Sequence, residues 1–265
     1  MRAVTFFLLW LIPAFPAFAG GEGSITRPHL DRTAGAHGIS LNGRTLISQG
    51  LVGAGRFPAD EVDFLGDTLG SFSSLQIAPG SWKRDGDHYE GILWTLPDRG
   101  RNDPAANLFF DYPARLNRFR IRFAPGSGRL DLIADGGLEL RDFRGQPFTG
   151  ADPGAGTLVE RGIVLPSPAD GLGAGKISID AEALQFTRDG GFYVGDEYAA
   201  NVYYFDRHGR LRGVITPPAA ITPRRGGRPD FGSLQPPDTG RRNNQGVEGV
   251  SLSPDGRTLF VALQS

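Results

Sequence analysis

The feature that most constrains the fold is a short unit that recurs along the chain, made of a tight turn, an apolar strand and an acidic loop. In residues 189–211, Asp189-Gly190 precedes the apolar run 192–194, which leads into the acidic pair Asp196-Glu197 and a second apolar run. Asp-Gly and Asn-Gly before β-branched and aromatic residues are typical of β-hairpins. The same turn signal recurs before apolar runs at Asn42-Gly43, Asp85-Gly86 and Asp255-Gly256. Units of this kind are typical of radial β architecture, so we predict an all-β chain that forms a β-propeller.

The composition favours many short strands joined by turns. Of the 265 residues, 39 are Gly and 20 are Pro, and few segments keep a helical period. We expect about four blades in the domain formed by residues 20–265. The propeller is expected to be incomplete, because no closing turn or returning strand follows the last apolar run, 260–263.

The first 19 residues predict a secretory signal peptide. Arg2 supplies the positive charge, residues 6–18 form the apolar region, and Ala17-Phe18-Ala19 offers a cleavage site before Gly20. The alternative is a membrane anchor, but the apolar run is short and contains two prolines, which disfavours an anchor. We therefore expect a secreted or periplasmic protein with no stable membrane span after cleavage. Because the chain has no Cys, its stability depends on packing or bound ions rather than disulfides.

Several common kinds of site are disfavoured by the sequence. A net charge of −1 indicates no nucleic-acid partner. There is no Cys nucleophile and no G-x-S-x-G motif of the hydrolase type. The histidines show no spacing typical of metal ligands, which disfavours a zinc site; they are His29, His37, His88 and His208.

Residues 118–123 alternate strictly between arginine and apolar side chains. Such alternation predicts a half-buried strand with one charged face. Charge on one face also discourages edge-to-edge pairing, so we expect this strand to lie at the outside of its sheet.

Six carboxylates lie within predicted strands or beside their ends: Asp98, Asp180, Glu182, Asp196, Glu197 and Glu248. Asp180 and Glu182 are two residues apart in a predicted strand, 177–186, so their side chains should project from one face. A propeller brings such positions to one mouth of its central channel, and hard carboxylate and amide oxygens there suit Ca²⁺. The alternative is that each carboxylate only caps its own turn.

Four motifs carry a resemblance to a known family: Leu96-Pro97-Asp98-Arg99-Gly100, Asp180-Ala181-Glu182-Ala183-Leu184, Val194-Gly195-Asp196-Glu197-Tyr198 and Asn244-Gln245-Gly246-Val247-Glu248-Gly249. With residues 253–259, they resemble the phytase-like family of secreted proteins, described as having esterase-like activity of phytase. The resemblance covers roughly residue 44 onward and implies a β-propeller with calcium and phosphate chemistry at its channel mouth. The family commonly has D-P-E-G at 180–183, and it continues beyond residue 265, so we expect the N-terminal portion of such a domain.

The expected activity is calcium-assisted hydrolysis of a phosphate ester or a related small-molecule ester. The six carboxylates above are the expected metal ligands. The expected catalytic residues are Asp98, Arg99 and Glu248, with Arg99 stabilising the developing anion. The expected substrate-binding residues are Arg99, Asn102, Tyr198 and Asn244.

Two alternatives to this activity stay open. One is a calcium-dependent lactonase similar to the gluconolactonases and paraoxonases, in which Asn244 and Glu248 would hold the ion. The other is a non-catalytic, calcium-stabilised binding module of the cell envelope. Neither the substrate nor the oligomeric state follows from the sequence.

Overall fold

The computed structural model describes residues 37–48, 51–58 and 60–264 of the chain. In these residues the protein is all-β, as predicted, with one short 3-10 helix, η1 (Pro104–Ala106), beside its strands. No helix in the described part is long and apolar enough to cross a membrane. The predicted signal peptide, residues 1–19, lies outside the described residues.

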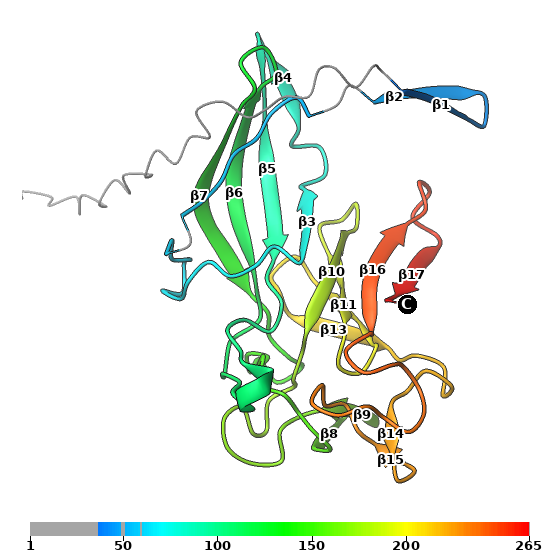
Figure 1. Ribbon diagram of the computed structural model, residues 1–265. Helices are drawn as coiled ribbons and strands as arrows, with labels where there is room; N and C mark the ends of the chain where they lie inside the picture. The colour runs from blue at the N-terminus through cyan, green and yellow to red at the C-terminus, as the bar shows by residue number, and fades with distance from the viewer. Residues whose placement is uncertain (1–36, 49–50, 59, 265) are drawn as a thin grey trace, which may run out of the picture.

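The first large sheet is an antiparallel meander (Figure 1). Its strands follow one another in sequence order: β3 (Ser74–Ile77), β5 (His88–Leu96), β6 (Arg115–Ala124) and β7 (Arg129–Glu139). A short strand, β4 (Lys83–Asp85), pairs with the beginning of β5 through a tight hairpin.

The second large sheet repeats this order. It consists of β10 (Ala181–Phe186), β11 (Phe192–Asp196), β12 (Val202–Phe205) and β13 (Leu211–Ile215), again antiparallel. A third sheet holds two strands, β16 (Val247–Leu252) and β17 (Leu259–Leu263). The remaining strands form three separate hairpins: β1 (His37–Leu41) with β2 (Arg44–Ser48), β8 (Thr157–Glu160) with β9 (Ile163–Pro166), and β14 (Arg224–Arg225) with β15 (Arg228–Pro229).

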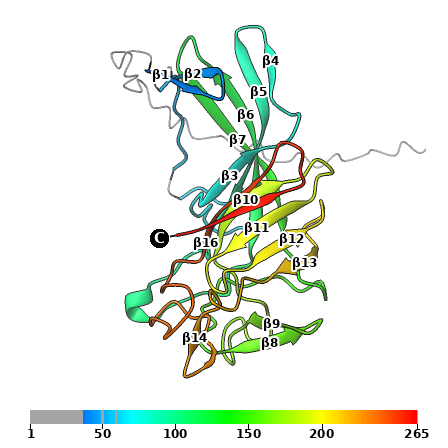
Figure 2. The same ribbon diagram turned by 90° about the vertical axis from the view of Figure 1, so that its right-hand side faces the viewer.

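The first strands of the three sheets lie side by side, with β10 in contact with both β3 and β16 (Figures 1 and 2). Polar side chains join them, because an edge strand needs partners for its backbone groups. The backbone N–H of Leu184 donates to Ser74 Oγ at 3.0 Å, and that of Phe186 donates to Gln76 Oε1 at 2.7 Å. The β16 residue Leu252 likewise donates its N–H to Gln185 Oε1 at 3.3 Å.

Apolar cores fill the spaces between successive sheets. The largest lies between the first and second sheets, where the rings of Phe192 and Phe205 stack with centroids 5.3 Å apart. It includes the fully buried residues Leu96, Leu116, Leu140, Phe148, Ile177 and Tyr203. A smaller core joins Val202 of the second sheet to Val247 of the third. Each sheet is therefore held face to face against the next by the hydrophobic effect.

The turn signals in the sequence predicted the hairpins correctly. Asn42 and Gly43 have φ values of 49° and 73°, the left-handed pair that a two-residue hairpin turn requires. Asp189-Gly190 likewise precedes β11, and Asp255-Gly256 precedes β17. The described residues contain two four-stranded meanders, fewer than the expected number of about four blades, and these sheets do not close into a barrel.

The arginine-rich segment 118–123 forms part of β6, and its predicted outer position is wrong. β6 lies inside the sheet, paired with β5 on one side and β7 on the other. Two arginines of its charged face have partners across the strands: Arg118 pairs with Asp135 of β7, and Arg122 Nε lies 3.7 Å from Glu90 Oε1 of β5. Cross-strand partners thus allow a charged strand to occupy a central position.

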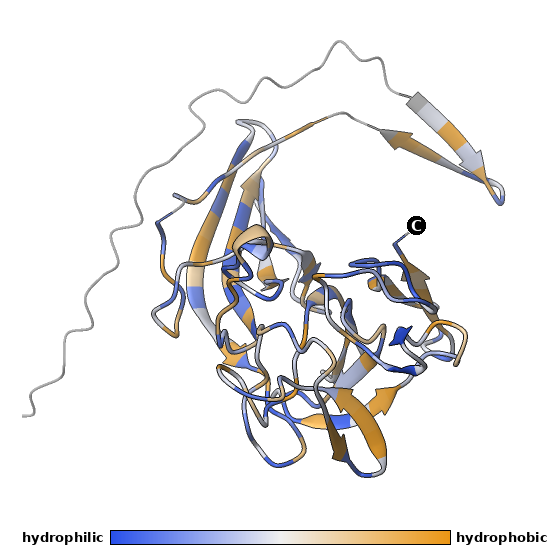
Figure 3. Ribbon diagram, turned by 60° about the horizontal axis from the view of Figure 1, so that its bottom comes forward, coloured by the Kyte–Doolittle hydropathy of each residue, from blue (hydrophilic) through white to orange (hydrophobic). Residues whose placement is uncertain are grey.

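Hydrophobic residues concentrate in the strands (Figure 3). Some of them are exposed. The β1–β2 hairpin projects from the rest of the molecule (Figures 1 and 3). Its side chains Ile39, Leu41, Leu46 and Ile47 are exposed, as are Phe260 and Val261 of β17. The β1–β2 hairpin and β17 therefore carry apolar surface that the described residues do not bury.

Candidate functional site

Three carboxylates meet where β10 begins and β11 ends. One oxygen atom from each of Asp180, Glu182 and Glu197 lies within 4.8 Å of the other two. Asp180 and Glu197 are buried, and Glu182 is half-buried. We call these three residues the acidic centre. The sequence analysis predicted all three as metal ligands, and the fold brings them together.

A β-bulge aims Glu182 into the acidic centre. Ala181 pairs with Asp196 and Ala183 pairs with Gly195, which leaves Glu182 without a partner residue on β11. Such bulges redirect a side chain and often lie next to functional sites. Glu197 is fixed from the other strand, because its backbone N–H donates to Asp180 O at 2.8 Å.

Asp196 supports the loop rather than joining the acidic centre. Its Oδ1 accepts the backbone N–H groups of Asp180 and Tyr198 at 3.1 Å each, and its Oδ2 accepts that of Ala199 at 2.8 Å. Burial raises the pKa of Asp196 to about 7, although these hydrogen bonds favour the carboxylate. Both carboxylate oxygens of Asp196 thus accept hydrogen bonds within the loop, whereas the sequence predicted Asp196 as a metal ligand.

The acidic centre favours bound protons at neutral pH. Burial, together with the charges of Asp180 and Glu248, raises the pKa of Glu182 to about 9. Burial also raises the pKa of Glu197 to about 8, with Asp180 as the next cause. The pKa of Asp180 rises only to about 6, because the nearby Arg99 opposes the effect of burial. Crowded, buried carboxylates behave in this way when no cation balances them.

Arg99 provides the positive charge at this site. Its Nη1 lies 3.0 Å from Asp180 Oδ2, and its backbone N–H donates to Asp180 Oδ1 at 3.2 Å. Nη1 also donates to Ser233 Oγ and Nη2 to Asn244 Oδ1, both at 3.1 Å. Nε is buried and has no acceptor among the described residues. The guanidinium is therefore held from three directions.

Ser233 and Asp152 form a support for Arg99 that the sequence analysis missed. Asp152 Oδ2 accepts the Ser233 hydroxyl at 2.6 Å and the Ser233 backbone N–H at 2.8 Å. The two residues are 81 positions apart, in the long connections between sheets. No local motif marks either of them, so only the fold could have revealed the pair.

The other predicted site residues lie around this centre in different roles. Glu248 and Asp98 are close enough to raise the pKa of Glu182 through their charge, but neither belongs to the three-oxygen group. Tyr198 is fully buried, and its hydroxyl donates to Gly150 O at 3.1 Å while its ring lies near the Arg99 guanidinium. Asn102 donates to Gly100 O at 2.8 Å within its own loop.

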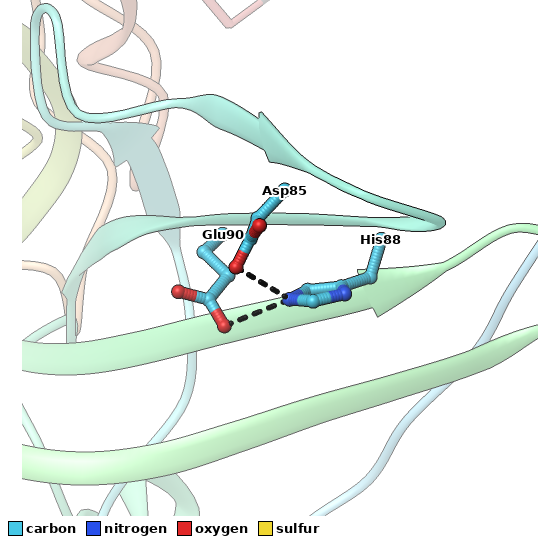
Figure 4. Close-up of side chains that lie close together, drawn as sticks. All are labelled: Asp85, His88 and Glu90. Atoms are coloured by element: carbon cyan, nitrogen blue, oxygen red, sulfur yellow. Dashed lines mark hydrogen bonds and ion pairs between the residues drawn. The ribbon is translucent and has the colours of Figure 1, made fainter.

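A second cluster of potential metal ligands lies at the tip of the β4–β5 hairpin (Figure 4). His88 Nε2 is 3.0 Å from Glu90 Oε1 and 3.7 Å from Asp85 Oδ2. The two carboxylates are exposed, and Arg122 approaches both His88 and Glu90. We call this group the hairpin cluster. It shows that His88 has carboxylate neighbours that the histidine spacing alone did not indicate.

The oxygens of the acidic centre are close enough together to be ligands of one cation. Ca²⁺ binds oxygen ligands at about 2.3–2.6 Å, so two ligands of one ion lie at most about 5 Å apart. The three oxygens of the acidic centre meet this limit. Asp180 Oδ2 has no hydrogen-bond donor among the described residues and only the ion pair to Arg99. Crowded carboxylates of this kind gain most from a bound cation.

Comparison with known proteins gives two matches. A family model described as phytase-like, with esterase-like activity of phytase, matches residues 68–265. The chain is also similar to an uncharacterized secreted protein of Arthroderma benhamiae, with 38% identity over 281 residues. That alignment covers 93% of this chain and 53% of the relative, so the chain spans about half the length of the curated relative it matches.

Proposed function

Because this chain belongs to the phytase-like family, described by its esterase-like activity of phytase, we propose that it is part of a secreted hydrolase of esters or phosphate esters. The similar protein of Arthroderma benhamiae is described as secreted, which supports an exported location. In this proposal the reaction takes place at the acidic centre and depends on Ca²⁺.

One observation carries the proposal: two buried carboxylates and a half-buried one share a space in which their charges are not balanced. Their pKa values of about 6, about 9 and about 8, for Asp180, Glu182 and Glu197, indicate that the nearby arginines, Arg99 and Arg241, do not balance their charges. Buried like charges are costly unless they are protonated or bind a cation. A site of this kind, built by a β-bulge at the junction of two sheets, is better explained by binding than by stability.

The proposed metal ligands are Asp180, Glu182 and Glu197. Glu248 and Asp98 add negative charge around them, which raises the affinity for a cation without direct ligation. When bound, Ca²⁺ neutralises substrate charge and lowers the pKa of a water molecule. The hydrogen bond from the backbone N–H of Glu197 to the carbonyl oxygen of Asp180 holds these two ligand residues next to each other.

Arg99 is the proposed anion-binding residue. Asp180, Ser233 and Asn244 fix its guanidinium, which reduces the entropy lost when it binds an anion. Tyr198 lies against Arg99 with a fully buried ring and a bonded hydroxyl, so in this proposal it positions Arg99 and does not touch substrate. Asn244 also acts through Arg99, since its side-chain oxygen accepts a hydrogen bond from Nη2.

We further propose that the domain is a β-propeller. Two four-stranded meanders with their first strands side by side, and a core between successive sheets, support this interpretation. The acidic centre then lies where the first strands of the second and third sheets begin, next to the propeller axis.

The test is an activity assay on the purified chain with a panel of phosphate esters, carboxylic esters and lactones. Each substrate is measured in excess chelator and again after calcium is restored. We expect turnover of an ester or phosphate ester that is lost in chelator and recovered with calcium. Turnover confined to lactones would favour the lactonase alternative. A calcium-dependent rise in melting temperature without any turnover would favour the binding module.

A further inference from the structure

The backbone arrangement that aims Glu182 into the acidic centre, a β-bulge at a glutamate, recurs in the third sheet. In the second sheet, Glu182 is the unpaired bulge residue between the pairs Ala181–Asp196 and Ala183–Gly195. In the third sheet, Glu248 is the unpaired bulge residue between the pairs Val247–Leu263 and Gly249–Ala262. Both glutamates are the second residue of the first strand of their sheet. A β-bulge changes the direction of a side chain, so its recurrence at a glutamate is unlikely to be a packing accident.

The strand-end residues match as well. The backbone N–H of Glu197 donates to Asp180 O at 2.8 Å, and that of Gln264 donates to Gly246 O at 3.1 Å. Asp180 and Gly246 are each two residues before the bulge glutamate of their sheet. Gln264 therefore occupies in the third sheet the place that Glu197 occupies in the second.

Gln264 also contacts the acidic centre directly. In the amide orientation that satisfies both neighbours, its side-chain nitrogen donates to Glu197 Oε1 at 3.2 Å and to Asn244 O at 2.8 Å. Gly246 lies against Glu197: a Cβ at position 246 would collide with the Cα and carbonyl oxygen of Glu197. The beginning of the third sheet is thus in close contact with one carboxylate of the acidic centre.

From this geometry we infer that Gln264 is a positioning residue of the acidic centre. Its side-chain amide orients Glu197. Because the amide is neutral, it also limits the negative charge of the centre and hence the affinity of the centre for divalent cations. This inference rests on the cation binding of the proposed function. An amide at this position donates a hydrogen bond to the Glu197 carboxylate. A carboxylate there would repel Glu197 in the absence of a cation and add a ligand oxygen in its presence.

The test compares Gln264→Glu with the wild-type chain in two measurements. Calcium chloride titration by calorimetry gives the affinity, and thermal unfolding in excess chelator gives the stability of the cation-free protein. We expect Gln264→Glu to bind calcium at least about tenfold more tightly and to unfold several degrees lower in chelator. Gln235→Glu is the matched control, because Gln235 is exposed like Gln264 but pairs with Arg225 instead of a residue of the acidic centre. If Gln264→Glu behaves as this control does in both measurements, the inference is wrong.

A charge-swap variant tests the equivalence of the two positions. Glu197→Gln should weaken calcium binding, and adding Gln264→Glu to it should recover part of the loss. A double variant that binds no better than Glu197→Gln alone would overturn the inference. If wild-type protein binds no calcium, yet Gln264→Glu still lowers stability in chelator, the proposed function fails while the contact between Gln264 and Glu197 is supported.

Discussion

The acidic centre and the hairpin cluster both bring three potential ligands together, and β5 connects the two regions. The hairpin cluster lies where β5 begins, and Asp98 and Arg99 follow where it ends. At the hairpin, Asp85 and Glu90 are exposed, and Arg122 lies beside Glu90 and His88. At the acidic centre two of the three carboxylates are withdrawn from water, and Arg99 and the buried Arg241 oppose their repulsion.

The difference between the two regions shows that proximity alone does not make a binding site. Solvent and Arg122 screen the charges of the hairpin cluster, so the closeness of its carboxylates changes the free energy of unfolding little. Burial denies the acidic centre this screening, and its pKa values rise as a result. A substitution at the acidic centre should therefore have a larger effect than its counterpart at the hairpin cluster.

The largest expected effect is the loss of stability when the guanidinium of Arg99 is removed from the acidic centre. Arg99→Gln leaves Asp180 buried without its ion-pair partner, which should cost roughly 3–5 kcal/mol in the free energy of unfolding at pH 8. Arg122→Gln, which breaks an exposed contact of the hairpin cluster, should cost less than about 1 kcal/mol. Denaturant unfolding of both variants measures the two values. Equal losses would show that burial does not distinguish the regions.

The second prediction concerns cation binding. Glu182→Gln should weaken calcium binding by about 100-fold or more, equivalent to about 2.7 kcal/mol, because it removes a charged ligand oxygen. The matched variant Glu90→Gln at the hairpin cluster should leave the affinity unchanged. Calorimetric titration of both proteins provides the comparison. A loss in Glu90→Gln as large as that in Glu182→Gln would place the bound ion at the hairpin instead.

The third prediction is a pH dependence of stability in chelator. The pKa values of Glu182 and Glu197 in the folded protein, about 9 and about 8, exceed the ordinary value of 4.5. Between pH 5 and pH 9 the folded state therefore holds protons that the unfolded state has released. Its stability is highest near pH 5 and should fall as the pH rises, lowering the melting temperature by roughly 4 °C or more.

Calcium should largely remove this pH dependence, because the ion replaces the protons on the same carboxylates. Thermal unfolding from pH 5 to pH 9, with and without calcium, measures both curves. Glu182→Gln should flatten the curve in chelator, and Glu90→Gln should not. Parallel curves with and without calcium would contradict the account.

The smallest effect is expected for Glu248→Gln. Glu248 influences Glu182 and Glu197 through its charge and is not one of the three converging ligands. Its neutralisation should therefore weaken calcium binding only about three- to tenfold, with a parallel loss of hydrolysis. Calorimetry and the ester assay measure these changes together. A loss as large as that in Glu182→Gln would make Glu248 a direct ligand.

Local features of the fold were predictable from the sequence because single dipeptides decide them. Asn42-Gly43 adopts the left-handed turn that its residues favour, and its hairpin follows from that turn. The central position of β6 was not predictable in the same way. It depends on partners from neighbouring strands, such as Asp135 for Arg118, and these pairs form only once the sheet is assembled.

The candidate site shows the same division. Asp180, Glu182 and Glu197 could be proposed because each lies beside a recognisable strand. Asp196 has the same sequence signature as its neighbour Glu197, but its shorter side chain folds back onto the loop backbone. Gln264 was missed because an amide at a strand end carries no signal of its own. An alignment of the strand ends of successive units, with Glu197 matched to Gln264, could have found it.

The most direct test of the account is a calorimetric titration of calcium into the wild-type chain at pH 7, repeated in two buffers with different enthalpies of ionisation. Because the acidic centre holds protons at this pH, we predict saturable binding that releases about one proton or more for each ion bound. The heats should then differ between the buffers. The absence of saturable binding, or equal heats in both buffers, would contradict the claim that the buried carboxylates form a cation site.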